Sequence, residues 1–463
     1  MTAAAVAAAV RAGEQSAVAL AEETLARIRE LDGDVNAFSC LLDEEAHAAA
    51  LAVEETVAAG RDPGPLAGVP VSIKDVVWVK DAPATNGCLA YRDFRPSEDA
   101  VLVERLRAAG AVIVGKTANP ELCFAGVTVN QVHGLTRNPW DLERTPGGSS
   151  GGAGASLALG LTPLAIGSDG GGSIRIPSSF CGVTGLKPTF GLVPSTPGFR
   201  GWPSLSVKGP MARTVGDLAL CLSVVAGAHP GDPATDRRPP PDFVAAAAAA
   251  DVTGLRIACS ADMGFAPLEP GVRACFDATV ERLAAGGWPL EEAHPGTGDP
   301  TPLWNGIAMP EGHASHRALL AEHEAELEPR TVEILRAGAG PSADYLDGQA
   351  ERAAYTGRWL AFFERFDVLL TPTMQLAAFP VGSYTPTHIG DYEVDPFFDD
   401  WCAFCLPANL TGMPAASIPC GLDGRGLPVG LQLMGRRFED DVVLHAAAAA
   451  EAVLPPVGAP VAA

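Results

Sequence analysis

The order of apolar and polar positions along the chain predicts helices that alternate with short buried strands. In residues 3–59, apolar side chains recur at three- and four-residue spacings, which is typical of helices. Apolar runs at Gly68–Lys74, Ala111–Val114 and Val368–Leu370 are too short for helices and predict strands. A helical pattern at Ala100–Ala109 separates the first two runs. This alternation indicates an α/β protein with a buried sheet.

The second half of the chain has fewer clear patterns. Residues 296–350 have helical composition, and the short alanine run Ala245–Ala250 also favours a helix. Gly231–Pro241 is rich in proline and charge, which predicts a surface loop. No internal repeat is present.

Composition supports a folded protein and argues against two classes of partner. Of the 463 residues, 47% are hydrophobic and 19% charged, which favours a large buried core. The formal net charge is −23, and such a field repels nucleic-acid phosphates and anionic lipids. Residues Met1–Glu14 lack the features of a signal peptide, and no apolar run reaches the length of a membrane span. We therefore expect a cytoplasmic protein without nucleic-acid or membrane partners.

The cysteines and histidines lack the spacing of a metal site. Ten cysteines, mostly within apolar runs, indicate reduced thiols packed in the core. Cys402 and Cys405 form a single CxxC, with no second pair or paired histidines nearby. His313, His316 and His323 share a predicted helix, but HExxH is absent. We predict no metal.

The segment from Pro146 to Gly191 concentrates glycine around two serines. Thirteen of its 46 residues are glycine, and apolar anchors between them argue against a flexible linker. Ser149 and Ser173 each lie among these glycines. A serine nucleophile needs a base and an oxyanion site, and small neighbours let successive N–H groups converge. In its apolar run, Lys74 is expected to lose solvation and become a neutral base.

Two patterns point to other chemistry but lack the right context. Gly110–Thr117 matches GxxxxGK[ST], yet its central residues are strand formers that cannot curl around phosphate, so we predict a strand ending in a surface lysine. Gly147–Gly151 matches the GxSxG elbow of α/β-hydrolases, in which a buried strand precedes the serine. Here two prolines and three charges precede Ser149. An esterase of this type, using Ser149, is the alternative mechanism.

The glycine-rich segment resembles the signature of the amidase signature family. The family pattern GGSSGG occurs at Gly147–Gly152, GxDxGGSIRxP at Gly167–Pro177, and CGxxGLKPT at Cys181–Thr189. Further family segments occur on both sides of this core, at Gly68–Pro70, Ile73–Asp75, Arg137–Trp140, Gly209–Thr214, Asn409–Pro414 and Gly426–Gln432. The resemblance therefore covers most of the chain.

The resemblance implies a triad and its supports. It makes Ser173 the acylated nucleophile, Ser149 a bridging serine held by a cis peptide, and Lys74 the terminal base. Asp169 and Arg175 would brace the loop without reacting.

The resemblance also assigns the oxyanion site to the backbone of Gly170, Gly171 and Gly172. At Gly170 the family usually has threonine or another residue with a side chain. This departure is expected to loosen the loop while keeping its N–H donor.

The family fold implied is a single α/β/α domain over residues 1–463, with a mixed sheet of about eleven strands covered by helices on both faces. The signature core would span about 65–225, a variable substrate-pocket region about 290–405, and a C-terminal family segment about 406–452. No metal or organic cofactor is implied, and a homodimer is left open.

The implied reaction is hydrolysis of a small-molecule amide, anilide or carbamate, with Cys123 and Phe124 close to the oxyanion loop. Five aromatic residues are expected to cover the pocket: Phe379, Tyr384, Phe397, Phe398 and Trp401. A tRNA-dependent amidotransferase subunit is disfavoured, because its usual glutamine after SIR is Ile176 here and because the net charge is strongly negative. A non-catalytic binding protein on this scaffold is disfavoured by the complete triad.

Overall fold

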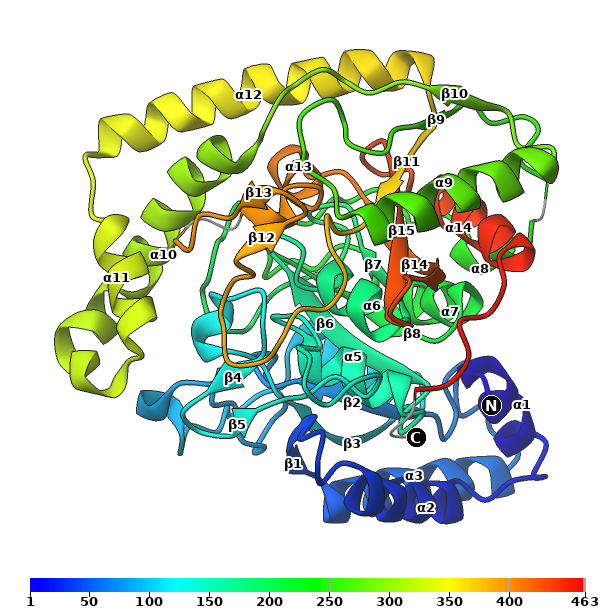
Figure 1. The fold of residues 1–463 in the computed structure, drawn as a ribbon. Coiled ribbons are helices and arrows are strands. Elements are labelled where there is room, and N and C mark those ends of the chain that lie inside the picture. Colours follow the sequence, from blue (N-terminus) through cyan, green and yellow to red (C-terminus); the bar gives the residue numbers. More distant parts are fainter. Residues whose placement is uncertain (250, 398–399, 461–463) are drawn as a thin grey trace.

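A mixed sheet of eleven strands forms the centre of the protein (Figure 1). The computed structural model describes residues 1–249, 251–397 and 400–460. From one edge to the other, the sheet consists of β1 (Phe38–Leu41), β3 (Val112–Thr117), β2 (Pro70–Lys74), β6 (Leu164–Asp169), β8 (Val207–Ala212), β7 (Thr184–Lys187), β14 (Ala415–Leu422), β15 (Pro428–Gly435), β11 (Val368–Pro372), β9 (Ile257–Cys259) and β10 (Leu290–Glu292). The α/β class and the eleven-stranded sheet are confirmed.

The sheet contains two groups of parallel strands with an antiparallel middle between them, and the edge strand β1 pairs antiparallel with β3. Strands β3, β2 and β6 run parallel to one another, as do β11, β9 and β10. Between them, β6, β8, β7, β14, β15 and β11 pair in antiparallel fashion. The β6–β8 register places Ser168 directly opposite Lys208.

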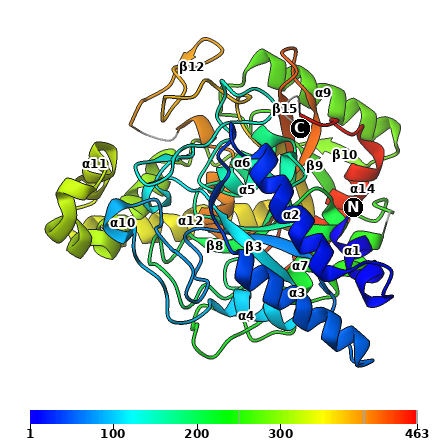
Figure 2. The same ribbon diagram turned by 90° about the horizontal axis from the view of Figure 1, so that it is seen from below.

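Helices surround the sheet on both sides (Figures 1 and 2). The helices are α1 (Ala3–Arg11), α2 (Ala17–Leu31), α3 (Asp43–Ala58), α4 (Val101–Ala108), α5 (Gly151–Ala158), α6 (Arg175–Cys181), α7 (Val215–Val225), α8 (Phe243–Ala248), α9 (Pro270–Ala285), α10 (Thr301–His323), α11 (Pro329–Ala337), α12 (Ser342–Arg365), α13 (Leu406–Thr411) and α14 (Asp440–Val453). Helices α5 and α6 pack against the central strands, and α10, α11 and α12 pack together beyond them.

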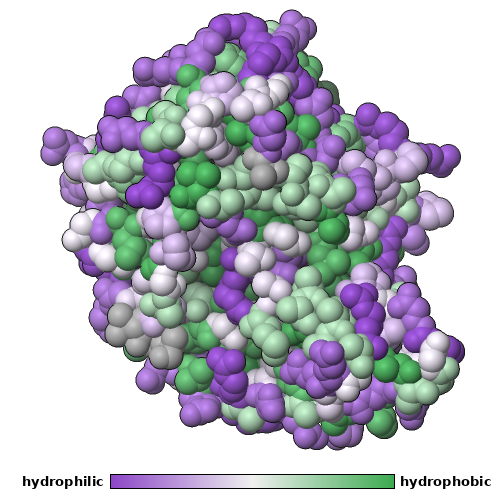
Figure 3. Space-filling model, turned by 90° about the vertical axis from the view of Figure 1, so that its right-hand side faces the viewer, coloured by the Kyte–Doolittle hydropathy of each residue, from purple (hydrophilic) through white to green (hydrophobic). Residues whose placement is uncertain are grey.

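Smaller elements complete the described chain. Two ribbons form away from the sheet, from β4 (Val129–Asn130) with β5 (Gly134–Leu135), and from β12 (His388–Ile389) with β13 (Tyr392–Glu393). On the face in Figure 3, hydrophobic residues gather in the middle, while hydrophilic residues dominate the upper and right-hand edges. Among the described residues, no helix is long and apolar enough to cross a membrane.

The predicted elements at Gly68–Lys74, Ala111–Val114, Ala100–Ala109 and Val368–Leu370 correspond to β2, β3, α4 and β11. The helical assignment of residues 3–59 missed strand β1, which has only four residues at the sheet edge. Of the predicted helix Ala245–Ala250, α8 includes residues up to Ala248, and Ala250 lies outside the described residues.

The expected surface lysine at the end of β3 was wrong. Lys116 is fully buried, and its Nζ donates to the carbonyl oxygens of Asp75 and Pro83, each at 3.0 Å. The cause is the missed strand, because β1 pairs with β3 and covers what would otherwise be the edge. Since Lys116 is held by protein carbonyls inside a strand, no phosphate-binding loop exists here.

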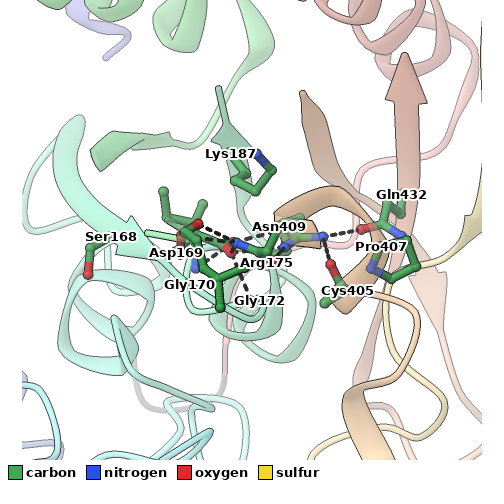
Figure 4. A network of polar contacts seen from close by, with 12 residues as sticks. Ser168, Asp169, Gly170, Gly172, Arg175, Lys187, Cys405, Pro407, Asn409 and Gln432 are labelled. Carbon is green, nitrogen blue, oxygen red and sulfur yellow. Dashed lines mark hydrogen bonds and ion pairs between the residues drawn. The ribbon is translucent and has the colours of Figure 1, made fainter. Parts of the chain in front are cut away.

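A buried ion pair joins the central strand β6 to the helices and strands around it (Figure 4). Asp169 ends β6, Arg175 begins α6, and both side chains are inaccessible to solvent. Arg175 Nε and Nη2 each donate to Asp169 at 2.9 Å, the bidentate geometry that makes such pairs strong. The same guanidinium donates to Asn409 Oδ1 on α13 and Gln432 Oε1 on β15.

Burial alone would raise the pKa of Asp169, but the Arg175 guanidinium outweighs burial and holds the pKa well below its usual range. The carboxylate therefore contributes to folding at neutral pH, and this contribution is lost only as the pH falls through the depressed pKa.

Asp169→Asn should destabilise the fold by about 3–5 kcal/mol, because it leaves the Arg175 charge buried without a counterion. Urea unfolding at pH 7, followed by circular dichroism, measures the change. Asp277→Asn is the matched control, since Asp277 pairs with Arg273 on the exposed surface of α9 and should barely shift the midpoint. Equal shifts in the two variants would contradict a structural role for the buried pair.

Candidate active site

Lys74 stands at the end of β2, a strand whose five residues are all buried. Its Nζ donates to Ser149 Oγ at 2.6 Å and to Ser168 Oγ at 2.9 Å. Burial lowers the pKa of Lys74 to about 8, and the positive charge of nearby Lys208 acts in the same direction. A neutral amine is therefore accessible near neutral pH, as we expected from its apolar sequence.

Ser149 lies in a loop two residues before α5, and the Gly148–Ser149 peptide is cis. A side chain at Gly148 would reach to 2.4 Å from the Val127 carbonyl oxygen, so only glycine fits there. The residues before Ser149 form turns and loops, without the strand that a nucleophile elbow requires. The Ser149 side chain is buried beside Lys74.

Ser173 lies between β6 and α6 and faces the same cavity as Ser149. Its carbonyl oxygen accepts a hydrogen bond from the Ser150 N–H at 3.1 Å, which ties the two serine loops together. Within the described residues, the Ser173 hydroxyl has no hydrogen-bond partner, and none joins it to Ser149. The structure thus forms the Lys74–Ser149 link and leaves the Ser173 hydroxyl open to the cavity.

The glycine loop before Ser173 offers backbone donors. The N–H groups of Gly170, Gly171 and Ser173 donate to no other described residue. Gly172 was expected to be a third glycine donor, but its N–H already donates to Asp169 Oδ1 at 2.8 Å. The sequence carried a signal for this, because an aspartate often binds the N–H two or three residues later in a turn.

Two tryptophans pack against the glycine loop. A Cβ at Gly170 would lie 2.5 Å from the Trp202 ring and 2.8 Å from Ser206 Oγ. Trp304 Nε1 donates to the Gly170 carbonyl oxygen at 3.0 Å. The loop is therefore fixed from outside, in contrast to the loosening expected from glycine at this position.

A cavity of about 970 Å³ opens onto Ser149, Ser173 and Gly170. Cys123 and Phe124 line it, close to the loop as the resemblance implied. Phe124 stacks on Trp202, with ring centroids 5.0 Å apart and an interplanar angle of 12°. This pair forms an apolar wall next to the serines.

The rest of the cavity lining differs from the prediction. From the expected region 290–405, the contributions come from α10, the connection at 338–341 and the start of α12. The unpredicted segments 190–208 and 231–234 also line the cavity. Phe379 and Trp401 pack against Phe180 in the core instead of covering the pocket. Tyr384 and Phe397 do not line it either, and Phe398 lies outside the described residues. Trp202 and its neighbours were missed because their place depends on contacts between distant segments.

The described residues contain no group of three or more histidine, cysteine, aspartate or glutamate side chains suited to a metal ion. Of the three histidines noted in the sequence, His313 lines the cavity and bonds to the Leu335 carbonyl oxygen at 2.8 Å. His316 is buried against Phe124.

Comparisons with known proteins identify the family of the chain. The family model Amidase matches residues 19–444. A glutamyl-tRNA(Gln) amidotransferase subunit of Salinispora tropica is 39% identical, covering 97% of this chain and 96% of the relative. Acylamidase of Rhodococcus erythropolis is 38% identical, and the match covers 97% of this chain and 94% of the acylamidase. The crystal structure of a bacterial aryl acylamidase of the amidase signature enzymes superposes on this chain with a TM-score of 0.92 at 30% identity. The superposition covers 100% of this chain and 99% of the aryl acylamidase. A family model that matches residues 19–444, and relatives of 38–39% identity over nearly the whole length, show that the chain belongs to the Amidase family, as an amidohydrolase of C–N amide bonds.

Proposed function

We propose that this amidohydrolase cleaves carboxylic amides, including anilides, through an acyl-enzyme on Ser173. The observation that carries the proposal is the 2.6 Å hydrogen bond between Lys74 and Ser149 beside a cavity that holds the open Ser173 hydroxyl. Lys74 as base, Ser149 as relay and Ser173 as nucleophile form the chain of proton transfers that an amide substrate needs.

In the first half of the reaction, neutral Lys74 takes the Ser149 proton while Ser149 takes the Ser173 proton. Ser173 Oγ attacks the carbonyl carbon, and the N–H groups of Gly170, Gly171 and Ser173 stabilise the oxyanion. The C–N bond then breaks, and the relay returns a proton to the leaving amine. In the second half, water attacks the Ser173 ester, which releases the carboxylic acid and restores the hydroxyl.

The cavity supports a substrate with an apolar or aromatic group. The stacked pair of Phe124 and Trp202 offers a flat surface for an aromatic ring next to the nucleophile. One structural neighbour is named an aryl acylamidase, and a relative is named an acylamidase. Carbamates have the same carbonyl geometry and are a second class to test.

A tRNA-dependent amidotransferase role is less well supported. Ile176 stands directly after Arg175 and packs in the core, and the chain carries a net charge of −23, which opposes a tRNA partner. A panel of anilides, aliphatic amides, carbamates and glutamine, assayed with the purified chain alone, tests the assignment. Release of ammonia from glutamine, without anilide hydrolysis, would favour the amidotransferase role.

Ser173→Ala should lower kcat by at least about a thousandfold while the protein stays folded, because the acyl-enzyme cannot form. A fluorophosphonate should add one covalent mass to the wild type and none to this variant, as read by intact-protein mass spectrometry. Ser223→Ala, at an exposed helical serine, is the control and should label normally. Labelling that disappears in Ser149→Ala but persists in Ser173→Ala would support the esterase mechanism instead.

The activity should rise with pH through a single ionisation near the Lys74 pKa of about 8, since only the neutral amine accepts a proton. Lys74→Arg should remove this rise of activity with pH, because a guanidinium keeps its proton. It should lower kcat about as much as Ser173→Ala does. Initial rates between pH 6 and 10 measure both effects. Lys80→Arg, at an exposed lysine, should keep the wild-type profile; the same profile in Lys74→Arg would refute the relay.

Gly170→Ala should lower kcat/KM at least about tenfold, because its Cβ would meet Trp202 and shift the oxyanion donors. The same substitution in a Trp202→Ala background should cost less, since the two sites are in contact. Gly216→Ala, where the added Cβ meets nothing within 4 Å, is the control. Equal costs with and without Trp202 would show that the clash is not the cause.

A further inference from the structure

Lys208 differs from the other lysines of this chain in what surrounds its ammonium. Lys74, Lys116 and Lys187 are buried, and each donates hydrogen bonds to hydroxyl or carbonyl oxygens. Lys80 is exposed to solvent. Lys208 is half-buried and lines the active-site cavity, yet it forms no hydrogen bond or ion pair with a described residue. The ionisable neighbour that acts on its pKa is the thiol of Cys123, and not a carboxylate.

The sheet register places Lys208 next to the reacting groups. Lys208 on β8 lies directly opposite Ser168 on β6, and cross-strand partners project their side chains from the same face about 5 Å apart. Ser168 accepts a hydrogen bond from Lys74 at 2.9 Å and also lines the cavity. The charge of Lys208 is close enough to act on the pKa of Lys74.

The acidic side chains of the cavity wall are held by other donors. Glu311 accepts from the Ser204 N–H at 3.1 Å and the Tyr345 hydroxyl at 2.9 Å. Asp232 accepts from the N–H groups of Ser195 and Ala234. Neither carboxylate forms an ion pair with Lys208 in the described structure.

Two further cations lie on the cavity wall at its exposed side. Arg200 and Arg317 are solvent-exposed lining residues, and neither makes an ion pair with a described residue. The lining therefore holds three cations (Lys208, Arg200 and Arg317) against two carboxylates (Glu311 and Asp232), a small local excess of positive charge in a chain whose formal net charge is −23. A local field of that sign attracts anionic small molecules.

We propose that Lys208 is a specificity-determining residue that binds a carboxylate of the substrate, so that the preferred substrates are amides with an acidic group near the scissile bond. This inference rests on the proposed amidase function and refines it. The carboxylate would occupy the unpartnered position beside Ser168, while an aromatic or apolar part of the same molecule packs on Phe124 and Trp202.

The physical reason is the cost of a charge that lacks a partner. A partly buried ammonium without an acceptor loses part of its hydration, and burial lowers the pKa of Lys208. A substrate carboxylate would supply the missing counterion through a charge-assisted hydrogen bond. A neutral substrate of the same shape leaves the ammonium unpaired, so the site discriminates against it.

Matched pairs of anilides test the preference directly. Succinyl-p-nitroanilide and butyryl-p-nitroanilide differ by a carboxylate on the acyl side, whereas N-acetyl-4-aminobenzoate and acetanilide differ by one on the amine side. We expect kcat/KM of the wild type to favour the acidic member of at least one pair by about tenfold or more. The pair that shows it identifies the side of the scissile bond that Lys208 serves.

Lys208→Met, which keeps the length of the side chain and removes its charge, should reduce that ratio at least tenfold. Lys208→Glu should reverse it. Lys80→Met is the control for loss of a lysine outside the cavity and should keep the wild-type ratio. An unchanged ratio in Lys208→Met, or the absence of any acidic preference in an active wild type, would overturn the inference.

A binding measurement separates this inference from the proposed function. Calorimetric titration of the Ser173→Ala protein with succinyl-p-nitroanilide should give a Kd at least tenfold lower than the Kd of the double variant that also carries Lys208→Met. If no anilide or amide is hydrolysed and no fluorophosphonate adduct forms, the proposed function fails. If amides are hydrolysed but neither Kd nor kcat/KM depends on the substrate carboxylate, only the role of Lys208 fails.

Discussion

The buried ion pair between Asp169 and Arg175 sets the geometry of everything around it. The carboxylate accepts two hydrogen bonds from the guanidinium, one from the Asn409 amide, and one each from the N–H groups of Gly172 and Ile174, so the glycine loop bends around it. The guanidinium in turn binds acceptors on α13 and β15, which are far away in the sequence. Because each of these groups is buried, none can turn to water as an alternative partner. The loop that carries Ser173 is therefore fixed before any substrate arrives.

Burial governs the lysines as well, with different results. Lys116 and Lys187 donate to backbone carbonyl oxygens, which accept a hydrogen bond but have no proton to exchange with the amine. Lys74 instead meets two serine hydroxyls, which can exchange protons with it. The same desolvation thus acts on three lysines, of which two face carbonyl oxygens and the third faces hydroxyl groups. The difference lies in the type of oxygen that faces each amine.

How far the sequence leads depends on whether the signal is local. The apolar runs of β2, β3 and β11 and the signature around Ser149 and Ser173 are contiguous, so they could be recognised from the sequence. Strand β1 could not, because four residues at a sheet edge show no usable period, and with it the burial of Lys116 was missed. The residues of the cavity wall could not be predicted for another reason. Trp202 contacts Phe124 and Trp304 only after three segments that are distant in the sequence have packed together.

The contact between Trp202 and Gly170 also restricts how the residues at these two positions can change in evolution. A side chain cannot be added at Gly170 while the indole fills the space, nor could the indole have arrived while a side chain was there. A change at one position therefore requires a change at the other, and the substitution that makes space has to come first. A sequence with tryptophan at 202 and a larger residue at 170 would contain a steric clash. A sequence with glycine at 170 and a small residue at 202 would contain a cavity. Tryptophan at 202 and glycine at 170 should therefore occur together across descendants of this branch.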